Sequence, residues 1–426
     1  MPDGASTAHL YRPKLATVLR EGYGARDLRA DAAAGLTVAV VALPLSMAIA
    51  VASGVSPERG LYAAIVGGVI VSALGGSRVQ IGGPAGAFIV LVAATAARFG
   101  PEGLLTAVFL SGFMLTLLGL ARVGSLVRHM PHAVTVSFTC AIAATIAASQ
   151  LKDFAGLRLS GPEPGAFVPK LAALAAGHSS LNPAACAIGL AVVAGISILR
   201  RFRPTWPGML IGVAAAGLAA WALKLPVETI GSRFGGLPRG LAPPALPPLQ
   251  PAMILQMMPS AVAFTLLGAV ESLLSAKVAD GMTGRRHRSN MELIAQGLAN
   301  VASALFGGIC VTGTIARTAT NVRAGARSPV SGMLHSAFLL VFMLVAAPLA
   351  AYVPLAALAG VLLVVCWTMA EKAEFIRLLR QWRPGSVALL TFGVTLARDL
   401  TTGIVAGCVL AALFALLRRP VAEEGE

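Results

Sequence analysis

Two short segments combine small residues, hydroxyl groups and one cation inside an otherwise apolar sequence. One is GGPAGAF at residues 82–88, and the other is GGICVTGTIARTATN at residues 307–321. A helix that begins in either segment leaves its first N–H groups without partners and carries about half a positive charge at that end. Two such ends facing each other, together with the guanidinium of Arg317, would bind an anion through backbone amides.

Glu271 is the second charged residue whose position suits chemistry. It lies in FTLLGAVESLLSAKVAD and is the only acidic residue in the middle of a predicted span. Ser275 follows four residues later on the same helix face, whereas Lys277 lies near the end of the segment. An ionisable residue inside a membrane is a functional candidate by default. Glu271 is therefore a candidate proton carrier, and Arg317 is its candidate partner.

The composition places these residues in a membrane. Of 426 residues, 57% are hydrophobic and only 12% are charged, whereas soluble globular proteins carry about 25% charge. Apolar runs near the roughly 20 residues that cross a bilayer recur along the chain, and the sequence lacks the short alternating segments of a β-barrel. We therefore expect an all-α integral membrane protein with many spans.

The apolar runs predict fourteen transmembrane segments. They cover residues 33–53, 60–76, 84–98, 103–121, 131–151, 183–199, 206–223, 253–278, 291–309, 314–325, 330–351, 354–370, 386–397 and 400–417, and the sixth could begin earlier, near Phe167. When the gaps are assigned alternately to two sides, most of the 33 Lys and Arg residues fall on one side, which should be cytoplasmic. The even count then places both termini in the cytoplasm, in a multi-pass protein of the inner (plasma) membrane.

The formal net charge of +15 has a topological explanation. The cations lie in the gaps between spans and not along one face, so no nucleic-acid partner is expected. The five cysteines lie in apolar stretches and the six histidines lack ligand spacing, so no metal, cofactor or disulfide is predicted. An intramembrane enzyme would need paired acid–base groups or metal ligands, and no enzymatic activity is expected.

The Pro-rich segment 225–251 divides the predicted spans into two sets of seven. Because seven is odd, related halves must have opposite orientations in the membrane, which is the inverted-repeat arrangement of many secondary transporters. The third and tenth spans then correspond, and both are short and contain small residues after a β-like stretch. Paired interrupted segments of this kind indicate a transport site. The structural alternatives are close helix packing for the glycines and a buried ion pair for Arg317.

The chain resembles the sulfate-permease (SulP) family, which is called solute carrier family 26 in animals. The resemblance rests on GLTVAVVALPLSMAIAVASGVSPERGLYAAIVGG at 35–68 and GGPAGAFIVL at 82–91. It continues in VESLLSAKVADGMTGRRHRSNMELIAQGLANVASALFGGI at 270–309 and RTATNVRAGARSPVSGMLH at 317–335. The similar region extends over residues 30–418.

The resemblance implies seven plus seven inverted spans with half-helices in spans 3 and 10. Spans one to four and eight to eleven would form a core domain, and the remaining spans a gate domain. The implied segments are a cytoplasmic N-terminal segment at 1–30, a first repeat at 31–224, an extracellular loop at 225–251, a second repeat at 252–418 and a C-terminal tail at 419–426. The family usually carries a STAS domain beyond that point, so we expect a truncated chain.

The resemblance also implies the substrate class and the site. The function would be secondary active transport of a small anion (dicarboxylate, sulfate or bicarbonate class) by alternating access, with proton symport preferred to coupling by sodium. The implied substrate-binding residues are Leu45, Ile49, Ala85, Gly86, Ala87, Thr314, Ile315, Ala316 and Arg317, and the implied proton-coupling residues are Glu271 and Ser275. Family members often have glutamine at the position of Leu45, which leaves the substrate open. The expected partners are the anion, a proton and the lipid bilayer, in a possible homodimer.

Two alternatives share this architecture. An uncoupled anion channel or exchanger of the same fold would carry every one of these motifs. A channel cannot accumulate its substrate against a gradient, so a measured stoichiometry would distinguish it. A nucleobase:cation symporter would be expected to bind the base ring through carboxylates, and Arg317 suits an anion better.

Overall fold

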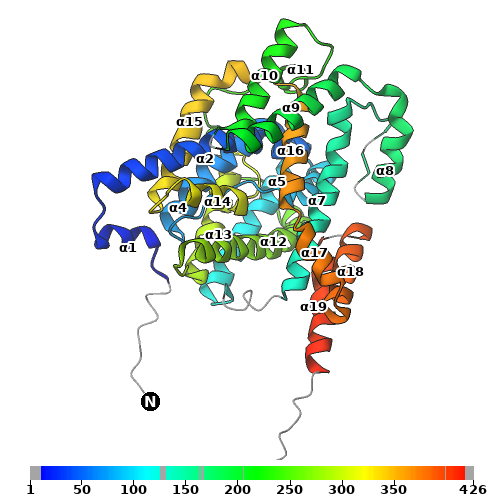
Figure 1. Ribbon diagram of the computed structural model, residues 1–426. Helices are drawn as coiled ribbons and strands as arrows, with labels where there is room; N and C mark the ends of the chain where they lie inside the picture. Colours follow the sequence, from blue (N-terminus) through cyan, green and yellow to red (C-terminus); the bar gives the residue numbers. More distant parts are fainter. Residues whose placement is uncertain are drawn as a thin grey trace, which may run out of the picture.

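The computed structural model describes residues 11–124, 131–161, 163–164, 167–204, 206–398 and 400–417. Helices make up nearly all of the regular structure in these ranges (Figure 1). The two strands among them are two residues long each and pair with each other. The C-terminal tail predicted at 419–426 and the first ten residues of the predicted N-terminal segment lie outside the described residues.

Up to the Pro-rich segment, helices follow one another with short connections. They are α1 (Lys14–Glu21), α2 (Ala25–Ala52), α3 (Pro57–Tyr62), the π-helical η2 (Ala63–Gly67), α4 (Gly68–Leu74), η3 (Gly86–Phe88), α5 (Ile89–Leu120), α7 (His132–Ala155), α8 (Phe167–Ala176), η4 (Gly177–Ser180), α9 (Pro183–Phe202), α10 (Gly208–Ala222) and α11 (Ile230–Phe234), with β1 (Gly82–Gly83) between α4 and η3. α5 bends at Gly100 (φ 70°, ψ −178°), just before Pro101. This break separates the predicted third and fourth spans.

The second half of the chain repeats the pattern of a short strand before a short helix. Its elements are α12 (Pro251–Thr283), α13 (Ser289–Leu305), β2 (Thr312–Gly313), α14 (Ile315–Arg323), α15 (Val330–Ala350), α16 (Leu355–Met369), α17 (Lys372–Leu379), α18 (Trp382–Ala397) and α19 (Leu400–Leu416). Each of the fourteen predicted spans therefore coincides with a helix or a half-helix. The short helices α1, α8, α11 and α17 were not expected.

The alternative start of the sixth span near Phe167 is wrong. α8 begins there but ends at Ala176, and α9 is a separate helix. The side chain of Asn182 accepts hydrogen bonds from the N–H groups of Ala184 (3.0 Å) and Ala185 (3.3 Å). Because this cap is followed by a proline at the first helical position, α9 can begin only at Pro183.

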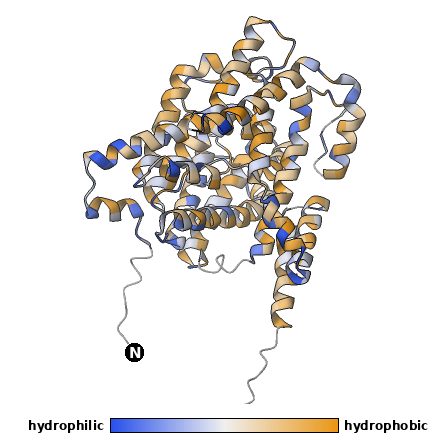
Figure 2. Cartoon of the chain, viewed as in Figure 1, coloured by the Kyte–Doolittle hydropathy of each residue, from blue (hydrophilic) through white to orange (hydrophobic). Residues whose placement is uncertain are grey.

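Seven of the described helical segments are long and apolar enough to cross a membrane, and the bent pair α16–α17 would make eight. Shorter apolar helices, such as α10 with 15 residues, occupy other predicted positions. Hydrophobic residues colour the outer helices along most of their length, whereas hydrophilic residues gather on α1 and near α17 (Figure 2). These features indicate a multi-pass membrane protein, and the count of fourteen spans stays a prediction.

The helices pack in two groups. In one group α5 packs on α12 and α13, and α15 packs on α2 and α4. In the other group α16 packs on α7 and α9, α7 packs on α18, and the pairs α9–α10 and α18–α19 lie outside them. Figure 1 shows the first group on the left of the molecule and α7, α8 and α17–α19 on the right.

Small residues allow α5 and α13 to approach closely. A Cβ atom at Gly297 would lie 2.6 Å from the backbone nitrogen of Thr116, and one at Gly112 would lie 2.7 Å from the carbonyl oxygen of Gly297. Contacts of this kind are typical of membrane helices, where small residues let two backbones meet. The α5–α13 contact therefore depends on the absence of side chains at these positions.

Two buried carboxylates hold the loops at one end of this group. Glu292 accepts hydrogen bonds from the N–H groups of Gly76 (2.9 Å) and Ser77 (3.1 Å). Asp31 accepts hydrogen bonds from the N–H groups of Arg327 (2.7 Å) and Ser328 (3.1 Å). Because a buried carboxylate is costly unless it accepts hydrogen bonds, each acid fixes the loop that satisfies it.

Replacing Gly297 by alanine should destabilise the protein. The added methyl group has to displace the α5 backbone, and overpacking of this kind costs about 1–3 kcal/mol. We expect Gly297→Ala to lower the melting temperature in detergent, measured by intrinsic fluorescence. Gly393→Ala is the matched control, because Gly393 lies in α18 with no atom within 4 Å of the added carbon. Equal melting temperatures for the two variants would contradict the close-packing explanation.

Candidate functional site

The two interrupted segments meet in the structure. β1 and β2 pair in antiparallel register, with Gly82 opposite Gly313 and Gly83 opposite Thr312. The N–H of Thr314 also donates to the carbonyl oxygen of Ile81 (3.0 Å). The stretches that lead into η3 and α14 therefore lie side by side in the middle of the first helix group, as the sequence predicts.

Polar side chains lock this pair of strands to the helices around it. Ile81 N–H donates to Thr318 Oγ1 (3.1 Å), and Asn321 Nδ2 donates to the carbonyl oxygen of Val79 (2.9 Å). From the other side, Gln80 Nε2 donates to the carbonyl oxygen of Ser272 in α12 (3.1 Å). Non-helical backbone at membrane depth needs partners of this kind. Gln80, Thr318 and Asn321 are not among the residues predicted for the site, although Gln and Asn next to apolar runs are a signal that could have found two of them.

Both half-helices begin without a side-chain cap. The residues that precede η3 and α14 are Ala85 and Thr314, and neither side chain accepts a hydrogen bond from the first turn. The first N–H groups of each helix therefore have no helical partner, and the helix dipoles add partial positive charge at the same place. α14 has only 9 residues, which is too short to cross a bilayer.

Arg317 lies at the junction of the two half-helices. Its side chain is 1% exposed, and Nη2 donates to the carbonyl oxygen of Pro84. Gly83 has φ 154°, and a Cβ atom there would collide with Nη1 of Arg317. Because only glycine suits both the conformation and the contact, Gly83 makes the space that the guanidinium occupies.

Arg317 has unused hydrogen-bond donors. Its Nε and Nη1 atoms are buried and have no hydrogen-bond partner among the described residues. No carboxylate in that part of the chain forms an ion pair with it, so the buried-ion-pair alternative is not what the structure contains. An unpaired cation in a low-dielectric site is strongly unfavourable. The arrangement is therefore suited to receive an anion.

Glu271 lies on α12 and is half-buried. In the described residues it makes no hydrogen bond and no ion pair, so it is not the direct partner of Arg317 that the sequence suggested. Its neighbour Ser272 hydrogen bonds Thr312 Oγ1 (2.7 Å) in β2. Ser275 is fully buried and donates to Thr318 Oγ1 (3.3 Å) in α14. Glu271 thus belongs to the helix that supports β2 and α14.

The remaining predicted residues lie around the half-helix starts. Leu45 and Ile49 of α2 are buried in the same apolar cluster as Ala85 and Ala87. Gly86 and Ile315 are half-buried, and Ala316 is exposed. A Cβ atom on Gly86 would lie 3.3 Å from Cδ1 of Ile146 in α7, a helix of the second group. The site therefore lies at the boundary between the two helix groups.

His335 is a buried polar residue for which the sequence predicts no ligand role. It is 0% exposed, and neither ring nitrogen has a hydrogen-bond partner in the described part of the chain. A Cβ atom on Gly68 would lie 3.2 Å from the carbonyl oxygen of Gly82 and 3.9 Å from His335 Nδ1. His335 and β1 therefore both lie next to Gly68. Among the described residues, no group of three His, Cys, Asp or Glu side chains could hold a metal ion.

Comparison with known proteins gives consistent results. Residues 28–392 match the sulfate permease family. The chain is 41% identical over 404 residues to the Bacillus subtilis protein YvdB, which is named as a candidate sulfate transporter, and the match covers 93% of this chain and 75% of YvdB. The family and these relatives are transporters and not enzymes.

Two solved structures are similar to this one. The transmembrane domain of the cyanobacterial bicarbonate transporter BicA has a TM-score of 0.80 at 28% identity, covering 92% of this chain and 98% of that chain. SLC26A9 has a TM-score of 0.87 at 19% identity, covering 97% of this chain and 69% of its own, which shows a common fold. Because the family match extends over most of the sequence and a relative is 41% identical, the chain belongs to the sulfate permease family.

Proposed function

We propose that the protein is a secondary active transporter of a small anion of the sulfate, bicarbonate or dicarboxylate class. The main support for this proposal is that Arg317 is a buried cation with two unpartnered nitrogens and lies between two uncapped helix starts. Oxyanions of this class accept several hydrogen bonds, which guanidinium and backbone N–H groups can donate. Relatives named as sulfate or bicarbonate transporters support the same class.

The packing of the helices supports two inverted repeats of seven spans. If α2, α4 and α5 correspond to α12, α13 and α15, the contacts of α5 with α12 and α13 mirror those of α15 with α2 and α4. Likewise, the contact of α7 with α18 mirrors that of α16 with α9. We infer that 31–224 and 252–418 are the two repeats, and that the cation-rich end of the molecule faces the cytoplasm.

The two helix groups correspond to the proposed core and gate domains. Ile146 of α7 contacts the start of η3, so the gate covers the site on one side. The polar contacts of β1, β2, α12 and α14 tie the half-helices to the core. We expect the core to move as a unit past the gate, which carries the anion across the membrane by alternating access.

Proton coupling through Glu271 is the finer part of the proposal. Protonation removes one negative charge from the helix that supports β2 and α14, so it makes the empty site more attractive to an anion. By reciprocity, a bound anion makes Glu271 easier to protonate. Because Glu271 and Arg317 form no ion pair, this coupling would act through the field and position of α12. Sodium symport and uncoupled exchange are the competing outcomes.

Arg317→Ala should weaken anion transport strongly. A charge-assisted hydrogen bond contributes about 1.5–3 kcal/mol, so we expect the apparent affinity for sulfate or bicarbonate to fall by about 10- to 100-fold. Uptake of labelled anions by proteoliposomes would measure this loss. Arg323→Ala is the matched control, because Arg323 lies in the same helix and is exposed. Comparable losses in the two variants would remove Arg317 from the anion site.

Glu271→Gln should uncouple transport from the proton gradient. The amide cannot exchange a proton, so uptake should no longer respond to an imposed pH gradient, whereas anion exchange should persist in part. Glu102→Gln is the control, since Glu102 is an exposed carboxylate outside the proposed site. Wild-type uptake that follows a sodium gradient and ignores the pH gradient would overturn the proton-carrying role and leave the anion site intact.

A further inference from the structure

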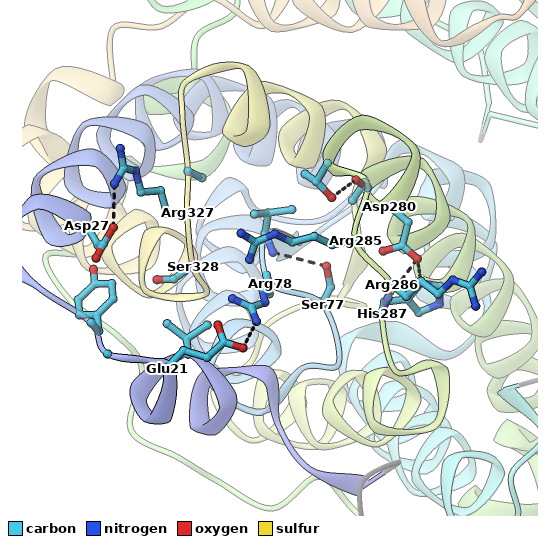
Figure 3. A pocket seen from close by; sticks show the side chains of 17 residues that line it. Glu21, Asp27, Ser77, Arg78, Asp280, Arg285, Arg286, His287, Arg327 and Ser328 are labelled. Atoms are coloured by element: carbon cyan, nitrogen blue, oxygen red, sulfur yellow. Dashed lines mark hydrogen bonds and ion pairs between the residues drawn. The ribbon is translucent and has the colours of Figure 1, made fainter.

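A second cationic site lies at the loop end of the core group. A cavity of about 570 Å³ opens there between α1, the segment before β1, the end of α12 and the segment before α15. Figure 3 shows Glu21 and Asp27 on one side of it, Asp280 on the other, and Arg78 and Arg285 between them. This volume falls in the range of about 300–1,000 Å³ that is typical of small-molecule pockets.

The three carboxylates that line the cavity, Glu21, Asp27 and Asp280, already have partners. Arg78 pairs with Glu21, and Arg327 pairs with Asp27 (2.9 Å). Asp280 accepts hydrogen bonds from the backbone N–H (3.1 Å) and the ring of His287 (2.6 Å). The lining carboxylates are thereby all engaged.

Two lining cations remain, Arg285 and Arg286, and Arg285 is the one that extends toward Arg78. It is exposed, and it makes no hydrogen bond or ion pair with the part of the chain that the structure describes. Figure 3 shows its side chain reaching from the α12 side toward Arg78. The cavity thus contains a free guanidinium beside a second one, that of Arg78, which pairs with Glu21.

Further cations lie close to the residues that line the cavity. Arg288 donates to the carbonyl oxygen of Arg12 (2.7 Å), and Nη2 of Arg12 is buried without a hydrogen-bond partner in the described chain. Burial, together with the positive charges of Arg288 and Arg78, lowers the pKa of Lys14. The hydrogen bond from Arg78, with Arg285 and Lys14 contributing, lowers the pKa of the Glu21 carboxyl. The Glu21 carboxylate is therefore surrounded by an excess of positive charge.

The walls of the cavity are built from fixed backbone. Glu292 holds Gly76 and Ser77, and Asp31 holds Arg327 and Ser328 through the hydrogen bonds described above. Tyr23 donates to Asp31 (3.0 Å), and burial raises the pKa of Tyr23 to about 12, so it remains a donor at neutral pH. The cationic side chains are therefore presented from a defined frame.

We propose that this cavity binds a phosphate group, carried either by a soluble phosphate compound or by the headgroup of an anionic phospholipid. The guanidinium groups of Arg285 and Arg78 match the planar, two-point hydrogen bonding that phosphate oxygens accept. The location at the predicted cytoplasmic face makes both sources available to it. This site goes beyond the proposed transport function and does not depend on it.

The cavity is joined to the half-helices by covalent and hydrogen bonds. Ser77, Arg78 and Val79 line it and lead directly into β1, and Asn321 of α14 donates to the carbonyl oxygen of Val79. A phosphate that bridges Arg78 and Arg285 would tie the entry of the first half-helix to the end of α12.

The test is direct binding of inorganic pyrophosphate to the protein in phosphatidylcholine nanodiscs, by isothermal titration at constant ionic strength. Arg285→Ala should weaken binding by about tenfold, which corresponds to about 1.4 kcal/mol. Glu21→Gln should have the opposite effect and tighten binding, because it removes the carboxylate that competes for Arg78. Arg200→Ala, an exposed cation at the end of α9 outside the cavity, should leave binding unchanged.

A second measurement separates the sources and the two anion sites. If a lipid headgroup reaches the cavity, phosphatidic acid in the nanodiscs should compete with pyrophosphate, and if only soluble phosphates reach it, the affinity should stay the same. Arg317→Ala should not change pyrophosphate affinity, since that residue belongs to the transport site. Absence of pyrophosphate binding in phosphatidylcholine nanodiscs, or equal affinity in wild type, Arg285→Ala and Glu21→Gln, would overturn the proposal.

Discussion

The rest of the structure depends on one buried guanidinium and the backbone that surrounds it. Arg317 is 1% exposed, and its described hydrogen bond is to the carbonyl oxygen of Pro84. A buried cation is unfavourable unless polar groups or an opposite charge compensate it. Its position therefore requires that the half-helix after β1 and the half-helix after β2 meet.

Where the two half-helices meet, backbone N–H and C=O groups lack helical partners, and a membrane interior supplies no water to bind them. The structure compensates with side-chain amides that bind main chain. Asn300 accepts from the N–H of Val311 (2.9 Å) and donates to its carbonyl oxygen (2.7 Å), while Gln80 and Asn321 do comparable work around β1. Each of these amides satisfies groups that a continuous helix would have satisfied itself. The interrupted segments therefore depend on side chains of the surrounding helices as well as on their own sequence.

The charged residues separate into two environments with different chemistry. In the middle of the core, Glu271 and Arg317 are single charges without ion-pair partners in the described chain, so binding and protonation can change the local charge. At the loop end, the carboxylates of Asp31 and Glu292 accept hydrogen bonds from backbone N–H groups, and they hold the loops in place. Glu271 is therefore a candidate for a charge switch, whereas Asp31 and Glu292 have a structural role because hydrogen bonds hold their carboxylates in place.

The sequence by itself determined the membrane class and the positions of the apolar helices, and it indicated that the two interrupted segments correspond. Those features are local: apolar run length, glycine and proline content and the placement of cations follow from composition. It also singled out Arg317 and Glu271, because a charge in an apolar run is visible without a structure. Only the tertiary structure decided that the two do not pair, that Ser275 binds Thr318, and that Asn182 ends the connection before α9. It also gathered Arg78 and Arg285, which are far apart along the chain, into one cavity. Distances between segments are set by helix packing, and no single segment contains that information.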